Sequence, residues 1–457
     1  MPFILAAALI AFLVYLVVPP AFPFLQTDSG SYIHFEAMRT PGYPMFLMAV
    51  EKIFGELRSA VPLQLAAMVA SAAYLACEIR RLTQSTLLGL VALALIVANV
   101  FIYRYAFTIM SEALFLSALA LLVGLICRFA AAPSTAIVAA LSFTIAISIL
   151  IRPVAYIFVP ILLLCAVIRY RAEGNRLRLV SYSALPMALV LTSGALAYYS
   201  HHGSFRTQSF LGHNLIGKTA YLPGSQVASR FPEIVALIDA HMQPLRDVRI
   251  ASLSDRFLFR ERHYDFVRYG LTTPLVERLS AAGAGEPDDI RKEVALAYIK
   301  AHPVDFAGEV WLQLYSLWTV AELRTATDNQ RFNALIASLP FKGTSTPSRA
   351  SMPWPAVYGI RAFVLGILVL TLFSIGYGAV ALVRKRAISL PWMALIMISF
   401  LLHGYMALVA ALQAGHFRYL IVMWPAIVAI AVLSGHIVLA RLFPGWDKWQ
   451  QHGFSPT

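Results

Sequence analysis

The chain has 457 residues, of which 59% are hydrophobic and 13% are charged, and its mean hydropathy is +0.71. A soluble domain has roughly a quarter of its residues charged, so this composition argues against a soluble enzyme. The formal net charge is +13, but residues 200–355 carry a net charge of only +2, which leaves +11 around the apolar blocks. Basic residues at the ends of apolar blocks set membrane orientation, so this distribution also argues against nucleic-acid binding.

The sequence predicts an all-α polytopic membrane protein, because its apolar blocks are long enough to cross a bilayer as helices of about 20 residues. We predict ten spans, approximately at 3–18, 60–77, 87–102, 107–127, 135–151, 154–168, 179–198, 362–383, 390–412 and 420–440. The first block lacks a basic start and a small-x-small cleavage site, which favours a retained span over a removed signal peptide.

Basic residues orient the predicted spans. Alternate connections hold most of them, namely Arg80, Arg81, Arg128, Arg169, Arg171, Arg176, Arg178, Arg384, Lys385, Arg386, Arg441 and Lys448. The positive-inside rule places these connections and both termini in the cytoplasm. The first loop, 19–59, and the long segment 200–355 are then extracytoplasmic, and a bacterial inner membrane is the expected location.

The predicted domains follow from this orientation. Residues 1–199 form an N-terminal transmembrane module, 200–355 an extracytoplasmic domain, 356–443 the closing spans and 444–457 a cytoplasmic tail. Three- and four-residue spacing of apolar residues predicts helices at 288–301 and 306–319, so we expect the outer domain to be mainly helical. Residues 44–54 predict a short helix along the membrane surface.

Acidic residues at the outer membrane boundary are few, and Asp28 is the first candidate for catalysis. It precedes a loop that contains Pro41 and Pro44, each of which restricts the backbone. A carboxylate on a rigid loop at a membrane surface is suited to act as a general base. The other interpretation is that Asp28 caps the following turn.

Glu112 stands at the outer end of the fourth predicted span, where it is either a second catalytic acid or the structural partner of Arg104 or Arg152. Arg418, with His416 two residues before it, lies at the same predicted face as Arg104 and Arg152. A guanidinium keeps its charge and binds phosphate with two hydrogen bonds, so these residues are candidates for binding a lipid phosphate. The other interpretation is that they anchor span ends at the headgroups.

The segment from Gly212 to Thr219 has the letters of a phosphate-binding loop, G-x-x-x-x-G-K-T. That loop needs a preceding buried strand, whereas a predicted span precedes this segment, so we predict no nucleotide site. Lys218 remains a candidate for contact with a donor phosphate or an acceptor. No His or Cys spacing typical of zinc is present, so no metal site and no cofactor are predicted.

The first outer loop resembles that of the GT-C superfamily of polytopic glycosyltransferases, which includes the protein O-mannosyltransferases and the aminoarabinose transferase that modifies lipid A. The resemblance is carried by Asp28, Tyr32, Arg39, Thr40, Pro41, Gly42, Tyr43 and Pro44. Weaker matches follow in the expected order, at Ser111, Glu112, Arg152, Pro153, Arg418, Tyr419 and Pro425. Together these matches and the order of spans and outer domain cover most of the chain.

The resemblance implies a glycosyltransferase that moves a sugar, with inversion, from a polyprenyl-phosphate donor to a glycan, lipid or protein of the cell envelope. Asp28 would deprotonate the acceptor hydroxyl. The departing phosphate would be stabilised by Arg104, Arg152, Arg418, His416 and Lys218. The loop would be shaped, or the substrate contacted, by Tyr32, Arg39, Tyr43 and Glu112. Because Ser29 stands where several members carry a second acid, a metal-dependent subgroup is not favoured.

Two other functions stay open. A ligase or polymerase of the O-antigen type would move a whole glycan, rely on His and Arg in a large outer loop and not need Asp28. A transporter or flippase of lipid-linked sugars would place charged residues near the bilayer midplane, whereas the charges here lie at span ends.

Overall fold

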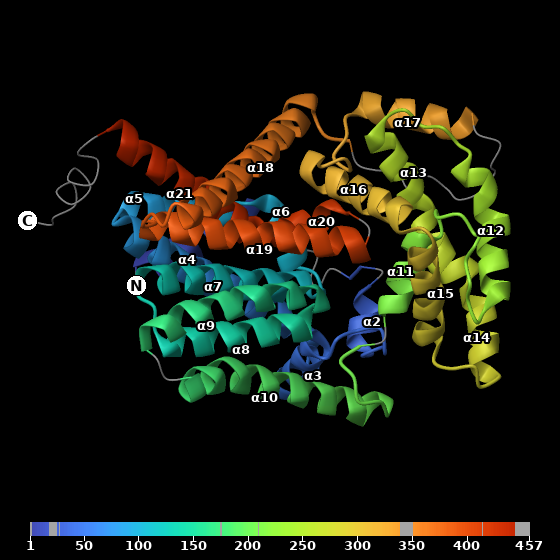
Figure 1. Cartoon of the computed structure of the whole chain (residues 1–457). Helices are drawn as coiled ribbons and strands as arrows, with labels where there is room; N and C mark the ends of the chain where they lie inside the picture. The colour runs from blue at the N-terminus through green and yellow to red at the C-terminus, as the bar shows by residue number, and fades with distance from the viewer. Residues whose placement is uncertain are drawn as a thin grey trace, which may run out of the picture. The chain divides into compact units, whose positions relative to one another are not determined.

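The structure is a computed structural model, and it describes residues 2–17, 25–26, 28–173, 176–208, 210–338, 351–413 and 415–443. Most of these residues lie in helices, and no β-strand occurs among them (Figure 1). The all-α fold class predicted from the sequence is therefore confirmed. The predicted cytoplasmic tail, 444–457, lies outside the described residues.

The chain divides into two compact units. The first consists of Met1–Gln208, Val369–Tyr405 and Ile421–Thr457, and the second of Ser209–Leu368 and Met406–Leu420. The first boundary follows Gln208, between two helices, and the other three fall inside the helices α18 (Trp354–Val383), α19 (Leu390–Leu412) and α20 (Phe417–Val422).

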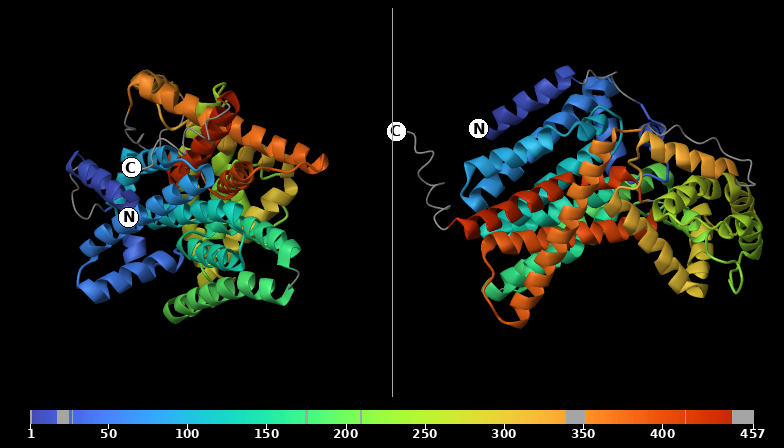
Figure 2. Two further views of the ribbon diagram at one scale, coloured as in Figure 1. Left: turned by 90° about the vertical axis from the view of Figure 1, so that its left-hand side faces the viewer. Right: turned by 90° about the horizontal axis from the view of Figure 1, so that it is seen from above.

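The first unit is a bundle of apolar helices. Its complete elements are α1 (Pro2–Val17), α2 (Ser29–Ile33), α3 (Gly42–Phe54), η1 (Leu57–Ser59), α4 (Ala60–Thr83), α5 (Thr86–Val97), α6 (Val100–Ala106), α7 (Glu112–Ala131), α8 (Thr135–Ile151), η2 (Pro153–Phe158), α9 (Val159–Glu173), α10 (Arg176–His202) and α21 (Trp424–Leu442). Its long helices run side by side (Figure 2), and α4 packs against α1, α5 and α7 while α8 packs between α7 and α10. In α7, 78% of the most apolar window is buried, so this helix lies at the centre of the bundle.

Five helical segments are long and apolar enough to cross a membrane, so the protein is a multi-pass membrane protein. They are Leu57–Thr83, Glu112–Ala131, Trp354–Val383, Leu390–Leu412 and Trp424–Leu442. The bent pair of α5 and α6 would add a sixth span, while the apolar helices at Phe3–Leu13, Thr135–Ile151 and Pro153–Ile168 are shorter. The predicted count of ten spans, and the sides that the charges assign to them, stay predictions.

The predicted span at 87–102 is not one straight helix. α5 and α6 meet at an angle of 56°. Asn99 begins α6, and its side-chain oxygen accepts a hydrogen bond from the Phe101 backbone N–H at 3.0 Å. A polar cap inside an apolar block thus starts a new helix where hydropathy alone predicts continuity.

The second unit surrounds a core of its own. Its elements are α11 (Leu211–Thr219), α12 (Pro232–Arg246), α13 (Leu253–Asp265), the π-helical turn η3 (Phe266–Leu271), α14 (Thr273–Ala281), α15 (Pro287–Ala301), α16 (Pro303–Thr319) and α17 (Ala326–Ser338). Ile238, Phe257 and Val294 are fully buried in this core. The helices predicted at 288–301 and 306–319 are confirmed as α15 and α16, each of which has proline in its first turn, where no backbone donor is lost.

The short helix predicted at 44–54 is α3. Its inner face buries Tyr43, Leu47 and Val50, while Met45, Met48, Ile53 and Phe54 are exposed on the outside. The helix ends at Gly55, whose φ of +77° is a left-handed conformation that favours glycine. An apolar outer face suits a membrane surface, and that location stays a prediction.

Candidate active site

The first loop is fixed against the ends of α8 and α10. A Cβ at Gly42 would lie 2.7 Å from the backbone of Leu150, so only glycine allows this approach of α3 to α8. The Thr40 hydroxyl donates to the Ile151 carbonyl at 2.9 Å, and the Tyr198 hydroxyl donates to the Ala37 carbonyl at 2.7 Å. The segment that follows Asp28 therefore has a defined shape.

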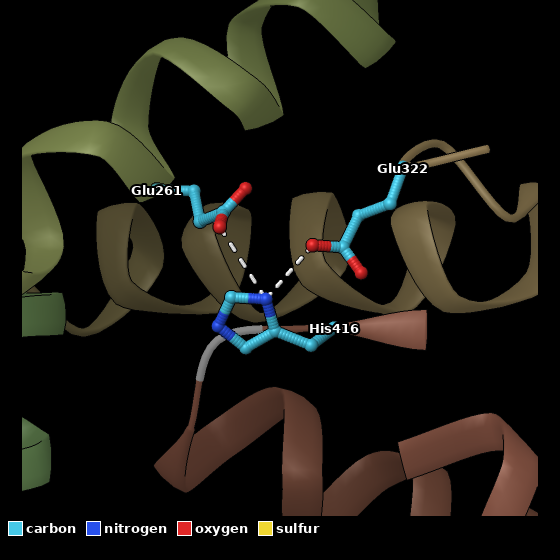
Figure 3. Close-up of side chains that lie close together, drawn as sticks. All are labelled: Glu261, Glu322 and His416. Atoms are coloured by element: carbon cyan, nitrogen blue, oxygen red, sulfur yellow. Dashed lines mark hydrogen bonds and ion pairs between the residues drawn. The ribbon is translucent and has the colours of Figure 1, made fainter. Parts of the chain in front are cut away.

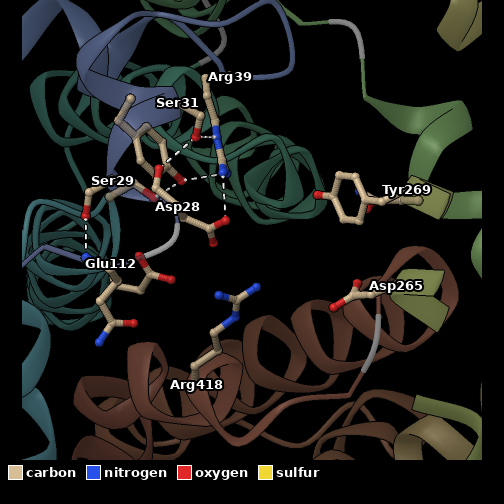
Figure 4. Close-up of polar contacts among 12 residues, drawn as sticks. Asp28, Ser29, Ser31, Arg39, Glu112, Asp265, Tyr269 and Arg418 are labelled. Carbon is tan, nitrogen blue, oxygen red and sulfur yellow. Dashed lines mark hydrogen bonds and ion pairs between the residues drawn. The ribbon is translucent and has the colours of Figure 1, made fainter. Parts of the chain in front are cut away.

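Asp28 and Arg39 form an ion pair on this loop, with 3.1 Å between Oδ1 and Nη2 (Figure 4). Arg39 also donates from Nε to the Ser31 hydroxyl at 2.8 Å and from Nη1 to the Tyr32 hydroxyl at 3.2 Å. Its guanidinium lies 4.2 Å from the centre of the Tyr32 ring. The side chain of Asp28 is 34% exposed and that of Arg39 only 14%, so the carboxylate is held on one side and accessible on the other.

The contacts of Asp28 discriminate between its two interpretations. The residue occupies the N-cap position of α2, but its side chain makes no capping hydrogen bond. Instead, its backbone carbonyl accepts a hydrogen bond from the Ser31 hydroxyl at 2.7 Å, and the carboxylate turns to Arg39. The geometry favours a carboxylate oriented by a guanidinium over a simple helix cap.

Tyr32 and Tyr43 form the floor of this site. Their rings pack edge to face with centres 5.1 Å apart, and the Tyr32 hydroxyl lies 2.9 Å from the Ser111 hydroxyl. Tyr43 is fully buried, which raises the pKa of its hydroxyl well above the usual value, and it donates to Gln64 Oε1 at 2.6 Å. Of the two roles predicted for Tyr43, its burial favours shaping the loop over touching a substrate.

Gln64 is a polar residue that the sequence did not single out. It is fully buried, and its amide donates to the carbonyls of Ala106 and Thr108 at 3.2 and 3.3 Å while accepting from Tyr43. It thereby joins α4 to α3 and to the connection before α7. The only sequence signal for it was a glutamine within an apolar block.

Glu112 is paired with Arg152, with 3.3 Å between Oε1 and Nη1. Their side chains are 1% and 11% exposed, and the Arg152 guanidinium lies 5.9 Å from the centre of the Phe115 ring. These contacts favour the structural interpretation of Glu112. Arg104, the other partner considered for it, has an exposed side chain on α6.

His416 and Arg418 lie in the second unit. His416 Nδ1 is 2.9 Å from Glu322 and 3.3 Å from Glu261. Burial disfavours the charged ring, but the two carboxylates outweigh it and raise the pKa of His416 to about 9. Arg418 donates to the Tyr419 hydroxyl at 3.3 Å, and its guanidinium lies 5.2 Å from that ring centre.

Lys218 lies in α11, so the letters of the phosphate-binding loop form a helix. The lysine is 3% exposed, and its ammonium donates to the carbonyls of Ala410 and Gln413, the latter at 2.6 Å. Burial lowers the pKa of Lys218 well below its usual value. These contacts favour a structural role over the predicted phosphate contact.

A polar cluster around the π-helical turn η3 was not predicted from the sequence. Arg268 donates to Asn214 Oδ1 at 3.0 Å and to the Tyr269 hydroxyl at 2.7 Å, and Asp265 lies 3.4 Å from it. The ring of His213 packs against Tyr269 with 4.4 Å between ring centres. Figure 4 shows Asp265, the last residue of α13, and Tyr269, which belongs to this turn.

No protein-family model and no curated protein matches the chain, but solved structures do. An oligosaccharyltransferase from Archaeoglobus fulgidus in the apo form is 13% identical with a TM-score of 0.45, and the match covers 100% of this chain and 52% of that one. ArnT from Cupriavidus metallidurans bound to undecaprenyl phosphate is 13% identical with a TM-score of 0.35, and the match covers 89% of this chain and 76% of that one. The chain is similar to both of these solved structures.

The chain spans about half the length of the archaeal enzyme, since it covers 52% of it.

Proposed function

We propose that this protein is a membrane glycosyltransferase that moves a sugar from a polyprenyl-phosphate donor to an acceptor on the extracytoplasmic side. The observation that carries the proposal is the partly exposed Asp28 carboxylate, which Arg39 holds at 3.1 Å. Buried contacts of Thr40 and Tyr43 fix the loop that bears both residues, and the loop belongs to a unit of apolar helices. A base preorganised beside apolar helices suits a substrate whose tail is a lipid.

In the proposed reaction, Asp28 takes the proton of the acceptor hydroxyl. The acceptor oxygen then forms a bond to the anomeric carbon while the bond from that carbon to the phosphate oxygen breaks. The products are the glycosylated acceptor and polyprenyl phosphate, and attack from the face opposite the phosphate inverts the anomeric carbon. The reaction needs no nucleotide and no cofactor.

Arg39, Ser31 and Tyr32 are positioning residues in this proposal. Arg39 donates to the other two, and these contacts support a carboxylate whose direction is set before substrate binds. Arg104 is an exposed residue, which supports its proposed role in binding the donor phosphate. The same role for Arg418 stays a prediction.

The proposed location is a bacterial inner membrane, with both termini in the cytoplasm and Asp28 on the outer face. The support is the distribution of arginine and lysine among the connections. The proposed acceptor is a glycan, lipid or protein of the cell envelope.

The test is sugar transfer by purified protein in lipid nanodiscs, from a panel of polyprenyl-phosphate sugars. Asp28→Asn is compared with Glu36→Gln, which makes the same change of charge on an exposed side chain of the same loop. We expect Asp28→Asn to lose at least about 100-fold in kcat, as removal of a general base does, and Glu36→Gln to keep wild-type activity.

Activity that survives Asp28→Asn would overturn Asp28 as the base. If a lipid-diphosphate glycan is then the donor that supports transfer, and His416→Ala abolishes that transfer, the ligase function replaces the proposed one. Uptake of a fluorescent lipid-linked sugar across vesicles without any transfer would favour the transporter.

A further inference from the structure

Three side chains from distant parts of the second unit converge on one point (Figure 3). Glu261 comes from α13, Glu322 follows α16, and His416 immediately precedes α20. Their ligating atoms all lie within 4.8 Å of one another. The side chains are 12%, 17% and 24% exposed, so the point is sheltered but reachable from solvent.

Both carboxylates approach the same ring nitrogen of His416. Glu322 Oε1 lies 2.9 Å from Nδ1, and Glu261 Oε1 lies 3.3 Å from it. A protonated Nδ1 has one hydrogen and satisfies one acceptor with good geometry. Both carboxylates therefore face the same edge of the ring, from which a neutral imidazole can offer the lone pair of Nδ1 to a cation.

The same distances are those of ligands around a metal ion. Zinc lies about 2.0–2.2 Å from imidazole nitrogen and carboxylate oxygen. Two ligands at such distances stand about 3.0 Å apart at a right angle and about 3.4 Å apart at a tetrahedral angle. The observed separations of 2.9 and 3.3 Å fall at this scale.

The chain around the three side chains also fixes their directions. The Phe417 backbone N–H donates to the second oxygen of Glu322, which turns Oε1 toward His416. Gly415, just before His416, donates to Gln313 Oε1 at 2.6 Å, and a Cβ at Gly415 would lie 2.8 Å from the Gln313 carbonyl. Hydrogen bonds that orient ligands are a regular feature of metal sites.

The turn that carries Glu322 is strained. Val320 ends α16 with φ of +50°, a left-handed conformation that is rare for a β-branched residue. Such strain persists where the surrounding structure requires it, and it clusters at binding sites. Here the strained residue turns the chain at the end of α16, two residues before Glu322, whose side chain faces His416.

We propose that Glu261, Glu322 and His416 bind one divalent transition-metal cation. One imidazole and two carboxylates offer one nitrogen and two carboxylate groups as ligands. This set suits Mn²⁺ or Zn²⁺ better than it suits Ca²⁺ and Mg²⁺, which prefer ligands that are all oxygen. Three protein ligands leave at least one position for water or a substrate oxygen. The site ties α13, the end of α16 and the start of α20 together, and it stands whether or not the protein transfers sugar.

The test is metal binding by the full-length protein in nanodiscs, with its affinity tag removed. After treatment with a chelator and dialysis, the protein is titrated with Mn²⁺, followed by the loss of the free-Mn²⁺ paramagnetic resonance signal, and with Zn²⁺, followed by elemental analysis. We expect about one ion per chain, and binding at least about 10-fold weaker in Glu261→Gln and in His416→Ala.

His302→Ala is the matched control, because His302 is a histidine of the same unit whose ring lies 3.7 Å from a single carboxylate, that of Asp305. It should bind the cation like the wild type. Equal binding by all variants, or no binding by the wild type, would overturn the proposal and leave His416 as an ion-paired imidazolium.

A second measurement uses the wild type alone and therefore tests the proposal even if the variants fail to fold. The chelator-treated wild type should melt at a lower temperature than the metal-loaded protein. Addition of Mn²⁺ or Zn²⁺ should raise its melting temperature again, and addition of Mg²⁺ should not. A melting temperature that none of the three ions changes would also overturn the proposal.

Discussion

The guanidinium of Arg39 lies 3.1 Å from the Asp28 carboxylate and 4.2 Å from the centre of the Tyr32 ring, so one side chain contacts both the proposed base and the floor beneath it. It does so with three different nitrogens, which bind Asp28, Ser31 and Tyr32. A planar group with fixed donor directions is needed for this, and a lysine ammonium cannot replace it.

Arg39→Lys is therefore expected to keep the charge but lose the geometry. We expect kcat to fall by about 10-fold or more, with the KM for the donor less affected, because the carboxylate is no longer held in one direction. Arg58→Lys, at an exposed arginine of η1, is the matched control and should behave like the wild type. Equal kcat values for the two variants would show that Arg39 does not position Asp28.

The buried pair of Glu112 and Arg152 gives a prediction about stability. Removal of one partner leaves an uncompensated buried charge, which costs about 3–5 kcal/mol, whereas removal of both costs less. We expect Glu112→Leu to melt at a much lower temperature than the wild type, and Glu112→Leu with Arg152→Met to recover part of the loss. The measurement is thermal unfolding in nanodiscs, and additive losses in the double variant would contradict a structural pair.

The parts of the fold that rest on local patterns could be predicted from the sequence. The apolar blocks predicted helices, and the spacing of apolar residues predicted α15 and α16 to within a few residues. The loop helix α3 was predicted from a short apolar run. Each of these signals is local, because a helix is specified by residues three and four apart.

The contacts that build the sites join distant residues, and no spacing predicts them. Tyr32 meets Ser111 across 79 positions of the chain, and His416 meets Glu322 across 94. The sequence made Asp28 a candidate because acids are scarce at the membrane boundary and because its loop resembles a known one, and its role stays a prediction. Glu261 and Glu322 were not found, because they lie among many acids of the outer segment and only the fold brings them to His416.

The imidazole of His213 predicts a dependence of stability on pH. It is 6% exposed, with Arg268, Arg291, Asp288 and Tyr269 around it, and burial together with the two arginines lowers its pKa to about 3. The unfolded chain binds a proton at about pH 6.5 and the folded one does not, so stability is lost as the pH falls from about 6.5 towards 3. Over this range, protonation of His213 lowers the free energy of unfolding by about 1.4 kcal/mol per pH unit.

Thermal unfolding at pH 7.5, 6.0 and 5.0 checks this, with His213→Gln as the comparison because carboxylates of the protein titrate in part of the same range. Between pH 6.0 and 5.0, the melting temperature of the wild type should fall by more than that of His213→Gln. Parallel curves for the two proteins would show that His213 takes up its proton without unfolding.

A substitution of Lys218 distinguishes between a structural role and a phosphate-binding role for this residue. Lys218→Met keeps the length of the side chain but leaves the carbonyls of Ala410 and Gln413 without their donor, at a cost of about 1–3 kcal/mol for each unsatisfied group. We expect a lower melting temperature and an unchanged KM for the donor. Lys292→Met, at a half-exposed lysine of α15, is the control. A donor KM raised about 10-fold at unchanged stability would instead assign Lys218 to the phosphate.

Two glycines of the first loop give the sharpest test of how that loop is held. A Cβ at Gly42 would lie 2.7 Å from both the carbonyl carbon and the oxygen of Leu150, whereas a Cβ at Gly30 would meet nothing within 4 Å. Because the atoms in the way belong to the backbone of α8, Gly42→Ala has to push α3 away from α8, at a cost of about 1–3 kcal/mol. Gly30→Ala makes the same chemical change inside α2 and is expected to be neutral or slightly stabilising.

Both variants are compared by melting temperature and by sugar transfer in nanodiscs. Gly42→Ala should lose stability and also lose activity well beyond that of Gly30→Ala, because a shift of α3 moves Arg39 relative to the carboxylate it orients. Loss of stability without loss of activity would show that the packing of α3 on α8 supports the fold but does not set the position of Asp28.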